Sequence, residues 1–352
     1  MKDVTSLSID LAKNVFQLHG TDKKGNAVLK KKVSRTKLFE FMVNLNSCNI
    51  YMEGCATANY WGREFQKCGH KVKLINPKYV KPYVKRNKND ANDAAAISSA
   101  SRDPEMRFGE VKTQDQQDMQ SMHRFRGLLV RQRTELANQI RGVLSEYGIS
   151  ISQGINNLKT EVKLILAGTA DHPHANKLTS ELLECLQENH KHLKELDEKV
   201  AFYDKKLLSL FKNNEVCQRL ETIPGIGVLG ATVLASTLGN GGGFKNGRHF
   251  AAFLGLTPKQ HSSGGKAKLL GISKGGDTYT RTLLIHGARA VLAASSKKND
   301  KLSLWLKRLQ IQRGYNKAAV ALANKLARIA CMVVKEGNKY DLNYKPRFLK
   351  AA

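Results

Sequence analysis

The chain has 352 residues, with 58 lysines and arginines against 30 aspartates and glutamates, which gives a formal net charge of +28 at pH 7. This length favours two or three domains, and a content of 41% hydrophobic and 25% charged residues excludes wholesale disorder. No segment is apolar over the length of a membrane helix and the start lacks a secretory leader, so we expect a cytoplasmic protein with no membrane partner. The positive charge indicates a polyanion, and nucleic acid is favoured over a membrane surface because no basic amphipathic helix stands apart from the folded pattern.

The first hundred residues alternate between short apolar strands and helices. The predicted strands span residues 5–10, 15–20, 27–33, 49–53 and 71–75. The predicted helices span residues 36–45, 59–68 and 90–101, and the last begins at Asn89 or Asp90, which are good helix caps. The spacing of the first three strands predicts an antiparallel meander. Three strands followed by strand–helix alternation is the order of a ribonuclease H-like α/β domain.

The middle of the chain is helical. Two long helices are predicted at residues 114–147 and 180–210, with a shorter one near 158–167. Apolar residues recur at near-heptad spacing in the second long helix, and arginines line the first. A helical hairpin within one chain and a coiled coil between chains both fit, since periodicity does not separate them.

From residue 216 the sequence is mostly helical and punctuated by glycine. Gly225, Gly227 and Gly230 match the GxGxxG spacing of dinucleotide-binding folds, but no strand precedes them and no acid follows at the required distance. We instead expect a turn resembling a helix-hairpin-helix module, whose backbone N–H groups could bind phosphate. A plain tight turn between packed helices is the alternative. The predicted parts of the chain are the α/β domain at 1–112, the helical region at 113–215, the C-terminal domain at 216–338 and a tail at 339–352.

Four acids stand out as candidate catalytic residues and metal ligands. Asp10 and Glu53 each end an apolar strand, and Asp90 and Asp93 share one face of a helix at a spacing of three residues. If the sheet is ribonuclease H-like, these carboxylates converge at one end of it. Clustered carboxylates need divalent cations, and oxygen ligands suit Mg²⁺, or Mn²⁺. The alternative is that Asp90 caps its helix and that Glu53 and Asp93 are surface charges.

A second candidate lies in a flexible, basic segment at residues 255–266. Ser262 and Ser263 are followed there by two glycines, with lysines on either side. A serine in this place could be a nucleophile toward phosphorus if a base or a metal activates it. On composition alone a linker is favoured, because Ser-Gly clusters are usually loops.

Basic residues are the candidate nucleic-acid contacts, since phosphate backbones bind Lys and Arg. They accompany the acids, the arginine-rich helix, the serine segment and the C-terminal helices. The predicted contacts are Lys85, Arg86, Lys88, Arg131, Arg133, Lys259, Lys266 and Arg281.

Several motifs, in order, resemble those of one enzyme family. They are SIDLAKN, YMEG, NDANDA, LVRQRTELANQIRG, IPGIGVLGA and QHSSGGK. Nearly the whole chain resembles the DEDD-type insertion-sequence transposases, the IS one-ten group and in particular its IS eleven-eleven branch, with the Piv site-specific invertases as relatives. The resemblance implies an N-terminal RuvC-like ribonuclease H fold, a central coiled coil and a mostly helical C-terminal transposase domain.

The resemblance also implies roles for single residues. The acids Asp10, Glu53, Asp90 and Asp93 match the family's metal-binding tetrad, and Ser263, with Ser262 as the adjacent alternative, matches its nucleophile. The serine would form a transient phosphoserine link to DNA.

The resemblance further implies partners and a place of action. These are donor and target DNA, a structured noncoding guide RNA, and a homodimer or homotetramer in which subunits share active sites. We expect a bacterial cytoplasmic enzyme that associates with the nucleoid while it acts. A RuvC-like structure-specific nuclease without a covalent intermediate, and a nucleic-acid-binding protein with an inactive catalytic fold, are the alternatives.

Overall fold

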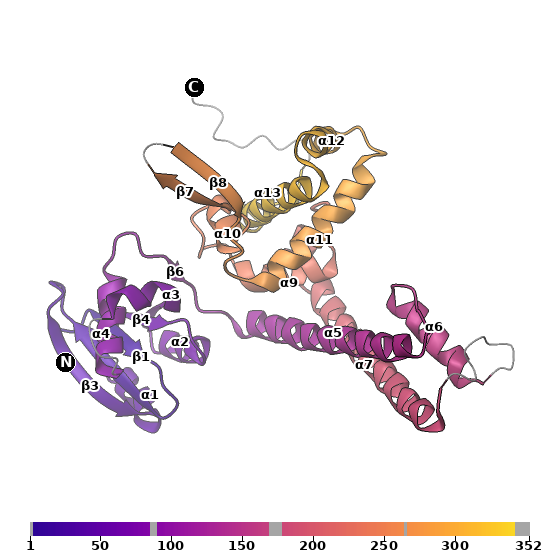
Figure 1. Ribbon diagram of the computed structural model, residues 1–352. Helices are drawn as coiled ribbons and strands as arrows, with labels where there is room; N and C mark the ends of the chain where they lie inside the picture. Colours follow the sequence, from indigo (N-terminus) through magenta and orange to yellow (C-terminus); the bar gives the residue numbers. More distant parts are fainter. Residues whose placement is uncertain (1–2, 85–89, 169–177, 264–265, 342–352) are drawn as a thin grey trace. The chain divides into compact units, whose positions relative to one another are not determined.

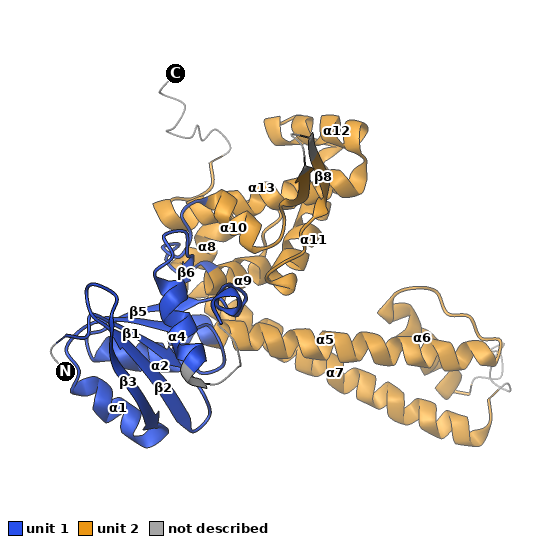
Figure 2. Ribbon diagram, turned by 60° about the vertical axis from the view of Figure 1, so that its left-hand side comes forward, with its two compact units in different colours: residues 1–117, 238–246 blue, residues 118–237, 247–352 orange. Residues whose placement is uncertain are grey.

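The computed structural model describes residues 3–84, 90–168, 178–263 and 266–341 (Figure 1). The chain divides into two compact units (Figure 2). Unit 1 consists of residues 1–117 and 238–246, and unit 2 of residues 118–237 and 247–352. The protein is therefore a mixed α/β chain with an N-terminal sheet and a largely helical C-terminal part.

Unit 1 is built on a six-stranded sheet with the order β3-β2-β1-β4-β5-β6. The strands are β1 (Ser6–Asp10), β2 (Val15–Thr21), β3 (Ala27–Ser34), β4 (Asn49–Glu53), β5 (Lys71–Ile75) and β6 (Phe108–Gly109). The first three strands pair antiparallel, whereas β4 runs parallel to β1 and β5 parallel to β4. The predicted meander and the five predicted strands are confirmed. The two-residue β6 escaped prediction because so short a strand shows no alternation.

Helices cover both faces of this sheet. They are α1 (Arg35–Val43), α2 (Ala58–Lys67), α3 (Pro77–Val80), the 3-10 turn η1 (Lys81–Tyr83) and α4 (Asp90–Ser101). Alternation along β4 explains the two layers, since Ile50 and Met52 join the core under α1 and α2, while Tyr51 packs with Ile97 of α4 on the other side. Helix α4 contacts β1, β2 and β4 and so lies over the middle of the sheet.

Unit 2 contains the helical hairpin. Its helices are α5 (Gln114–Glu146, whose first turn belongs to unit 1), α6 (Ile155–Leu166) and α7 (Ser180–Lys212). Arg126 of α5 pairs with Asp204 of α7, and Arg133 pairs with Asp197, so the two long helices run antiparallel. Buried apolar residues of α5, α6 and α7 form one core. The long helices thus pair within one chain, while a coiled coil between chains stays a prediction.

The remaining helices of unit 2 include α13, against which four others pack. They are α8 (Glu215–Glu221), α9 (Val228–Leu238), α10 (Gly247–Phe253), α11 (Thr278–Ser295), α12 (Lys301–Arg313) and α13 (Tyr315–Glu336). Helix α13 contacts α8, α10, α11 and α12, and its apolar face is almost fully buried. Throughout the described ranges, every helix is too short or too polar to cross a membrane.

The turn between α8 and α9 has the predicted helix–turn–helix form. Gly225 adopts a left-handed φ of +83°, and a Cβ at this position would lie 2.7 Å from the carbonyl oxygen of Gly287 in α11. The glycine is therefore required by a close backbone approach between packed elements. This contact agrees with the plain structural turn that we kept as the alternative.

The serine segment differs from the expected flexible loop. It forms the antiparallel strands β7 (Pro258–Ser263) and β8 (Lys266–Ile272), in which His261 faces Lys268 and Ser263 faces Lys266. Pairing satisfies backbone N–H and C=O groups that a polar, exposed loop would leave to water. The missed signal was the Gly-Gly pair between two extended runs, which is a common hairpin sequence. Residues 264–265 lie outside the described ranges.

Candidate active site

Asp10 and Glu53 lie side by side at the carboxyl ends of β1 and β4, the two central strands of the sheet of unit 1. Strands β1 and β4 are parallel, and Ile9 pairs with Met52, so the next residue on each strand is an acid at the same carboxyl end. Both acids are partly exposed. Burial raises the pKa of the Cys55 thiol, and the negative charges of Glu53 and Asp10 raise it further. The charges of the two carboxylates therefore both reach the Cys55 thiol, as expected of neighbouring side chains.

The other two acids belong to α4, which packs against β1 and β4. Asp93 lies in the first turn of this helix and is partly exposed. Asp90 is the first residue of the helix, but its side chain lies outside the described part of the structure. Across the side chains that are described, no three carboxylate, imidazole or thiol groups gather closely enough to hold a metal ion. The structure thus brings Asp10 and Glu53 together and leaves the completion of the tetrad untested.

The donor set at these strand ends fits a hard divalent cation. Two neighbouring carboxylates repel each other, and oxygen ligands favour Mg²⁺ or Mn²⁺ over softer metals. Their combined field already disfavours a thiolate at Cys55.

The serine hairpin of unit 2 carries the second candidate group. Ser262 is exposed, and its hydroxyl accepts a hydrogen bond of 2.7 Å from the side-chain amide of Gln260. Ser263 ends β7, and its side chain lies outside the described part of the structure. Lys259 and Lys268 on the two strands are exposed. The hairpin is therefore a basic, water-exposed element that carries two serines near its end.

The predicted nucleic-acid contacts have different surroundings. Arg131 and Lys259 are exposed and available to phosphate, whereas Arg133 is half-buried and donates to Asp197 at 2.9 Å. Arg281 is only 7% exposed and donates hydrogen bonds to atoms of its own chain. These bonds give Arg281 a structural role, and its contact with nucleic acid stays a prediction. Lys85, Arg86, Lys88 and the side chain of Lys266 lie outside the described ranges.

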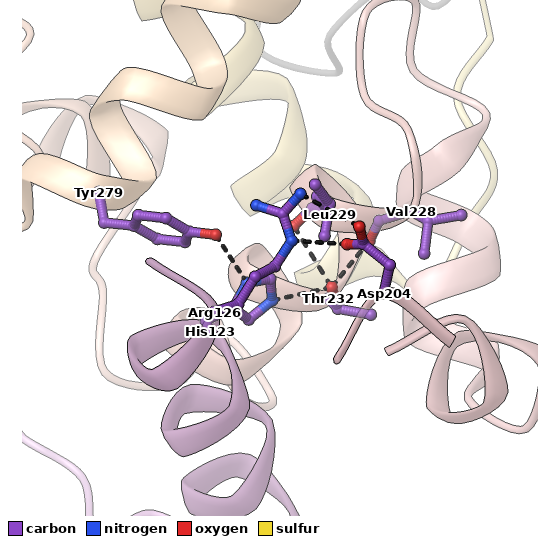
Figure 3. Close-up of polar contacts among 7 residues, drawn as sticks. All are labelled: His123, Arg126, Asp204, Val228, Leu229, Thr232 and Tyr279. Atoms are coloured by element: carbon purple, nitrogen blue, oxygen red, sulfur yellow. Dashed lines mark hydrogen bonds and ion pairs between the residues drawn. The ribbon is translucent and has the colours of Figure 1, made fainter. Parts of the chain in front are cut away.

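A polar network that the sequence did not reveal is centred on the buried His123 and joins α5, α7, α9 and α11 (Figure 3). Nε2 of His123 lies 2.9 Å from the hydroxyl of Thr232, and Nδ1 lies 3.1 Å from the hydroxyl of Tyr279. Arg126 donates to Asp204 at 2.5 Å and also to the hydroxyl of Tyr279. His123 was missed because it occupies an apolar stripe of α5, where only the packing shows its partners.

The network fixes the protonation of His123. The Thr232 hydroxyl donates to the carbonyl of Val228 at 2.8 Å, so Nε2 of His123 must donate to that hydroxyl. Nδ1 is then free of a proton and accepts from Tyr279. Burial lowers the pKa of His123 to about 4, and the nearby charge of Arg126 contributes in the same direction. His123 is therefore neutral at physiological pH and stabilises the junction of the helices.

Comparison with known proteins identifies the class of enzyme. Residues 7–149 match a family described as Transposase, of the DEDD IS110 type, and residues 217–302 match the Transposase IS116/IS110/IS902 family. The chain is 44% identical to the transposase for insertion sequence element IS1111A of Coxiella burnetii, over 97% of this chain and 92% of that protein. It is 40% identical to the transposase for insertion sequence element IS1328 of Yersinia enterocolitica, over 97% of this chain and the full length of the relative.

A more distant relative is the pilin gene-inverting protein of Moraxella bovis, 23% identical over 85% of this chain and 83% of that protein. The resemblance expected from the motifs, including the invertases as relatives, is confirmed. The chain belongs to the IS110 family of insertion-sequence transposases, enzymes that cleave and rejoin DNA.

Proposed function

We propose that this transposase breaks and rejoins DNA with a metal-binding acid site in unit 1 and a serine nucleophile in unit 2. The observation that carries the proposal is the placement of Asp10 and Glu53 as neighbours at the carboxyl ends of two parallel strands. Acids at these ends, on strands flanked by an antiparallel meander, support a RuvC-like ribonuclease H fold for the N-terminal domain. We extend the proposal to the division of the chain into parts at 1–112, 113–215 and 216–338.

The acids would hold a divalent ion, Mg²⁺ or Mn²⁺. Asp10 and Glu53 would supply the first ligands, and Asp93 and Asp90 would complete the set from α4. When bound, the ion supplies Lewis-acid stabilisation of charge on phosphoryl oxygens. The residues themselves would bind and orient the ion: the ends of β1 and β4 carry two of the carboxylates, and α4, which carries Asp93, packs on these strands.

The serine would carry the covalent step. The Oγ of Ser263, or of Ser262, attacks the phosphorus of a DNA phosphodiester, a new O–P bond forms, and the bond to the deoxyribose oxygen breaks. The serine proton passes to solvent or a nearby base, and the leaving oxygen takes up a proton. A second DNA hydroxyl then attacks the phosphoserine and restores the serine. Lys259 and Lys268 support this proposal because they place positive charge along the hairpin.

The partners of this reaction follow from the charge and its distribution. The net charge of +28 divides into +10 over residues 1–112, 0 over residues 113–215 and +18 over residues 216–352. Two strongly basic parts of the chain support the binding of both DNA and a structured guide RNA. The acids and the serine belong to different units, which supports an active site assembled in a homodimer or homotetramer.

A recombination assay tests the proposal. The protein, purified with its bound RNA, is incubated with Mg²⁺ and DNA carrying both element ends. We expect the double variant Ser262→Ala/Ser263→Ala and the variant Asp10→Asn each to abolish joined product, while Glu105→Gln, which removes an exposed acid outside the site, leaves it unchanged. DNA that the double serine variant still cleaves but does not join, and that Asp10→Asn does not cleave, would favour a RuvC-like nuclease without a covalent intermediate. Full activity of Asp10→Asn would overturn the acid site.

A further inference from the structure

The two arms of the serine hairpin come together in a tightly built stem. One arm leaves α10 at Leu254 and Gly255, and the other returns through Gly275 to the cap of α11. Beyond the paired strands, the N–H of Ser273 donates to the carbonyl of Thr257 at 2.8 Å, and the N–H of Lys274 to the carbonyl of Gly255 at 3.1 Å. The stem thus continues the ladder down to the helices.

Two glycines allow the arms to approach more closely than side chains permit. Gly255 has a φ of +67°, and a Cβ on it would lie 2.3 Å from the carbonyl oxygen of Gly275. Gly276 has a φ of +71°, and a Cβ on it would lie 1.8 Å from the carbonyl oxygen of Phe253. Backbone therefore packs directly on backbone at the base of the hairpin.

Arg281 joins the two arms at this base. Its Nη1 donates to the carbonyl of Leu254 at 2.9 Å and to that of Gly275 at 2.7 Å, so one nitrogen bridges both arms. Its Nη2 donates to the hydroxyl of Thr278 at 3.0 Å. The rigid, planar guanidinium can satisfy these acceptors together, whereas a lysine ammonium is a compact point charge on a flexible stem.

The helix that carries Arg281 is itself fixed. Asp277 caps α11, with its carboxylate accepting from the N–H groups of Tyr279 and Thr280 and from the Thr280 hydroxyl. Tyr279 also belongs to the polar network of His123 (Figure 3). The guanidinium therefore projects from a first helical turn that is anchored on two sides.

We propose that Arg281 is a positioning residue for the serine hairpin. By bonding to both arms, Arg281 holds them at one angle, so that the serines meet DNA in the reactive geometry. This rests on the proposed role of the serine. Ser263 lies eight residues from Gly255, which is roughly 26 Å of strand at about 3.3 Å per residue. A tilt of about 5° at the stem then moves the end of the hairpin by about 2 Å, and displacements of about 1 Å can cost a factor of about 100 in rate.

The test compares Arg281→Gln and Arg281→Lys with Arg289→Gln. Arg289 is on the same helix but is exposed, and its guanidinium donates to Asn316 at 3.3 Å. The protein with its bound RNA is mixed in excess with a nicked DNA spanning an element end. The covalent adduct is followed in a single turnover, and the Kd for the same DNA and the unfolding midpoint are measured in parallel.

We expect the adduct rate of Arg281→Gln to fall at least about tenfold, with a Kd within about twofold of wild type. The adduct rate of Arg281→Lys should lie between those of Arg281→Gln and wild type, and the adduct rate of Arg289→Gln should match that of wild type. Amide exchange at Ser273 and Lys274 should quicken in both Arg281 variants while exchange in α13 is unchanged. An adduct rate at the wild-type level, or a loss fully accounted for by unfolding, would overturn the proposal.

Failure of the proposed function gives a different result. If the wild-type protein forms no adduct at all, the serine chemistry is wrong, and amide exchange at Ser273 and Lys274 still decides whether Arg281 clamps the stem. Should Arg281→Gln fail to fold, the comparison of Arg281→Lys with wild type keeps both readouts.

Discussion

Acid should weaken the junction of α5, α9 and α11, because His123 is neutral and enclosed in the folded chain. It is 2% exposed, and burial lowers its pKa to about 4 from an ordinary value of 6.5. The unfolded chain binds the proton more tightly than the folded one. The contribution of His123 to stability is therefore fully present above about pH 6.5 and is lost as the pH falls toward about 4.

The difference in proton affinity of His123 between the folded and the unfolded chain sets the size of its contribution to stability. At about 1.4 kcal/mol per tenfold change in affinity, the whole contribution is about 3 kcal/mol, of which about 2 kcal/mol is lost at pH 5. Protonation of Nδ1 would also remove the acceptor of the Tyr279 hydroxyl. That hydroxyl already accepts a hydrogen bond from the cationic Arg126, so it is poorly placed to accept a second one from the imidazolium.

Urea unfolding followed by helical circular dichroism measures this loss at pH 7.5 and pH 5. Wild type should lose about 2 kcal/mol more than His123→Gln, which keeps an amide donor and acceptor but does not titrate. His192→Gln, which changes an exposed histidine of α7, controls for the substitution itself. Equal losses in wild type and His123→Gln would refute the reasoning.

Three further predictions use other parts of the chain. Gly276→Ala should destabilise unit 2 by about 3 kcal/mol or more, because its Cβ meets backbone, whereas Gly271→Ala, which has open space, should be close to neutral in the same thermal unfolding assay. Asp10→Asn should lower the pKa of Cys55 and speed its alkylation at pH 7 about twofold relative to the exposed Cys185, as read by peptide mass spectrometry; an unchanged ratio would separate Asp10 from that thiol. DNA binding should weaken steeply between 50 and 200 mM salt, by roughly a thousandfold for about six phosphate contacts, and a salt-independent Kd would contradict the electrostatic account.

Much of unit 1 could be predicted because its sequence repeats simple physical patterns. Leu7 and Ile9 in β1, and Ile50 and Met52 in β4, alternate with residues on the other face, and this alternation gave the strands. The parallel neighbours β1 and β4 then follow from the strand order, which places Asp10 and Glu53 together. These acids were found because each ends an apolar strand.

The serine hairpin could not be predicted from such patterns. Residues 258–262 are exposed and mostly polar, so this part of β7 has no buried face to produce alternation. The structural role of Arg281 was missed because a sequence shows charge but not burial, and its partners are backbone carbonyls, which leave no mark in the composition. His123 was hidden for the same reason, since its partners come from α9 and α11, more than a hundred residues away.

The covalent intermediate is the most direct test of the central claim. The wild-type protein with its bound RNA and Mg²⁺ is allowed to react with a nicked element-end DNA, digested with protease and nuclease, and the peptides are sequenced by mass spectrometry. The account predicts a phosphorylated or nucleotide-bearing serine at Ser263, or at Ser262, that is absent from Asp10→Asn. Cleaved DNA with no modified serine in the peptide spanning β7 and β8 would contradict it.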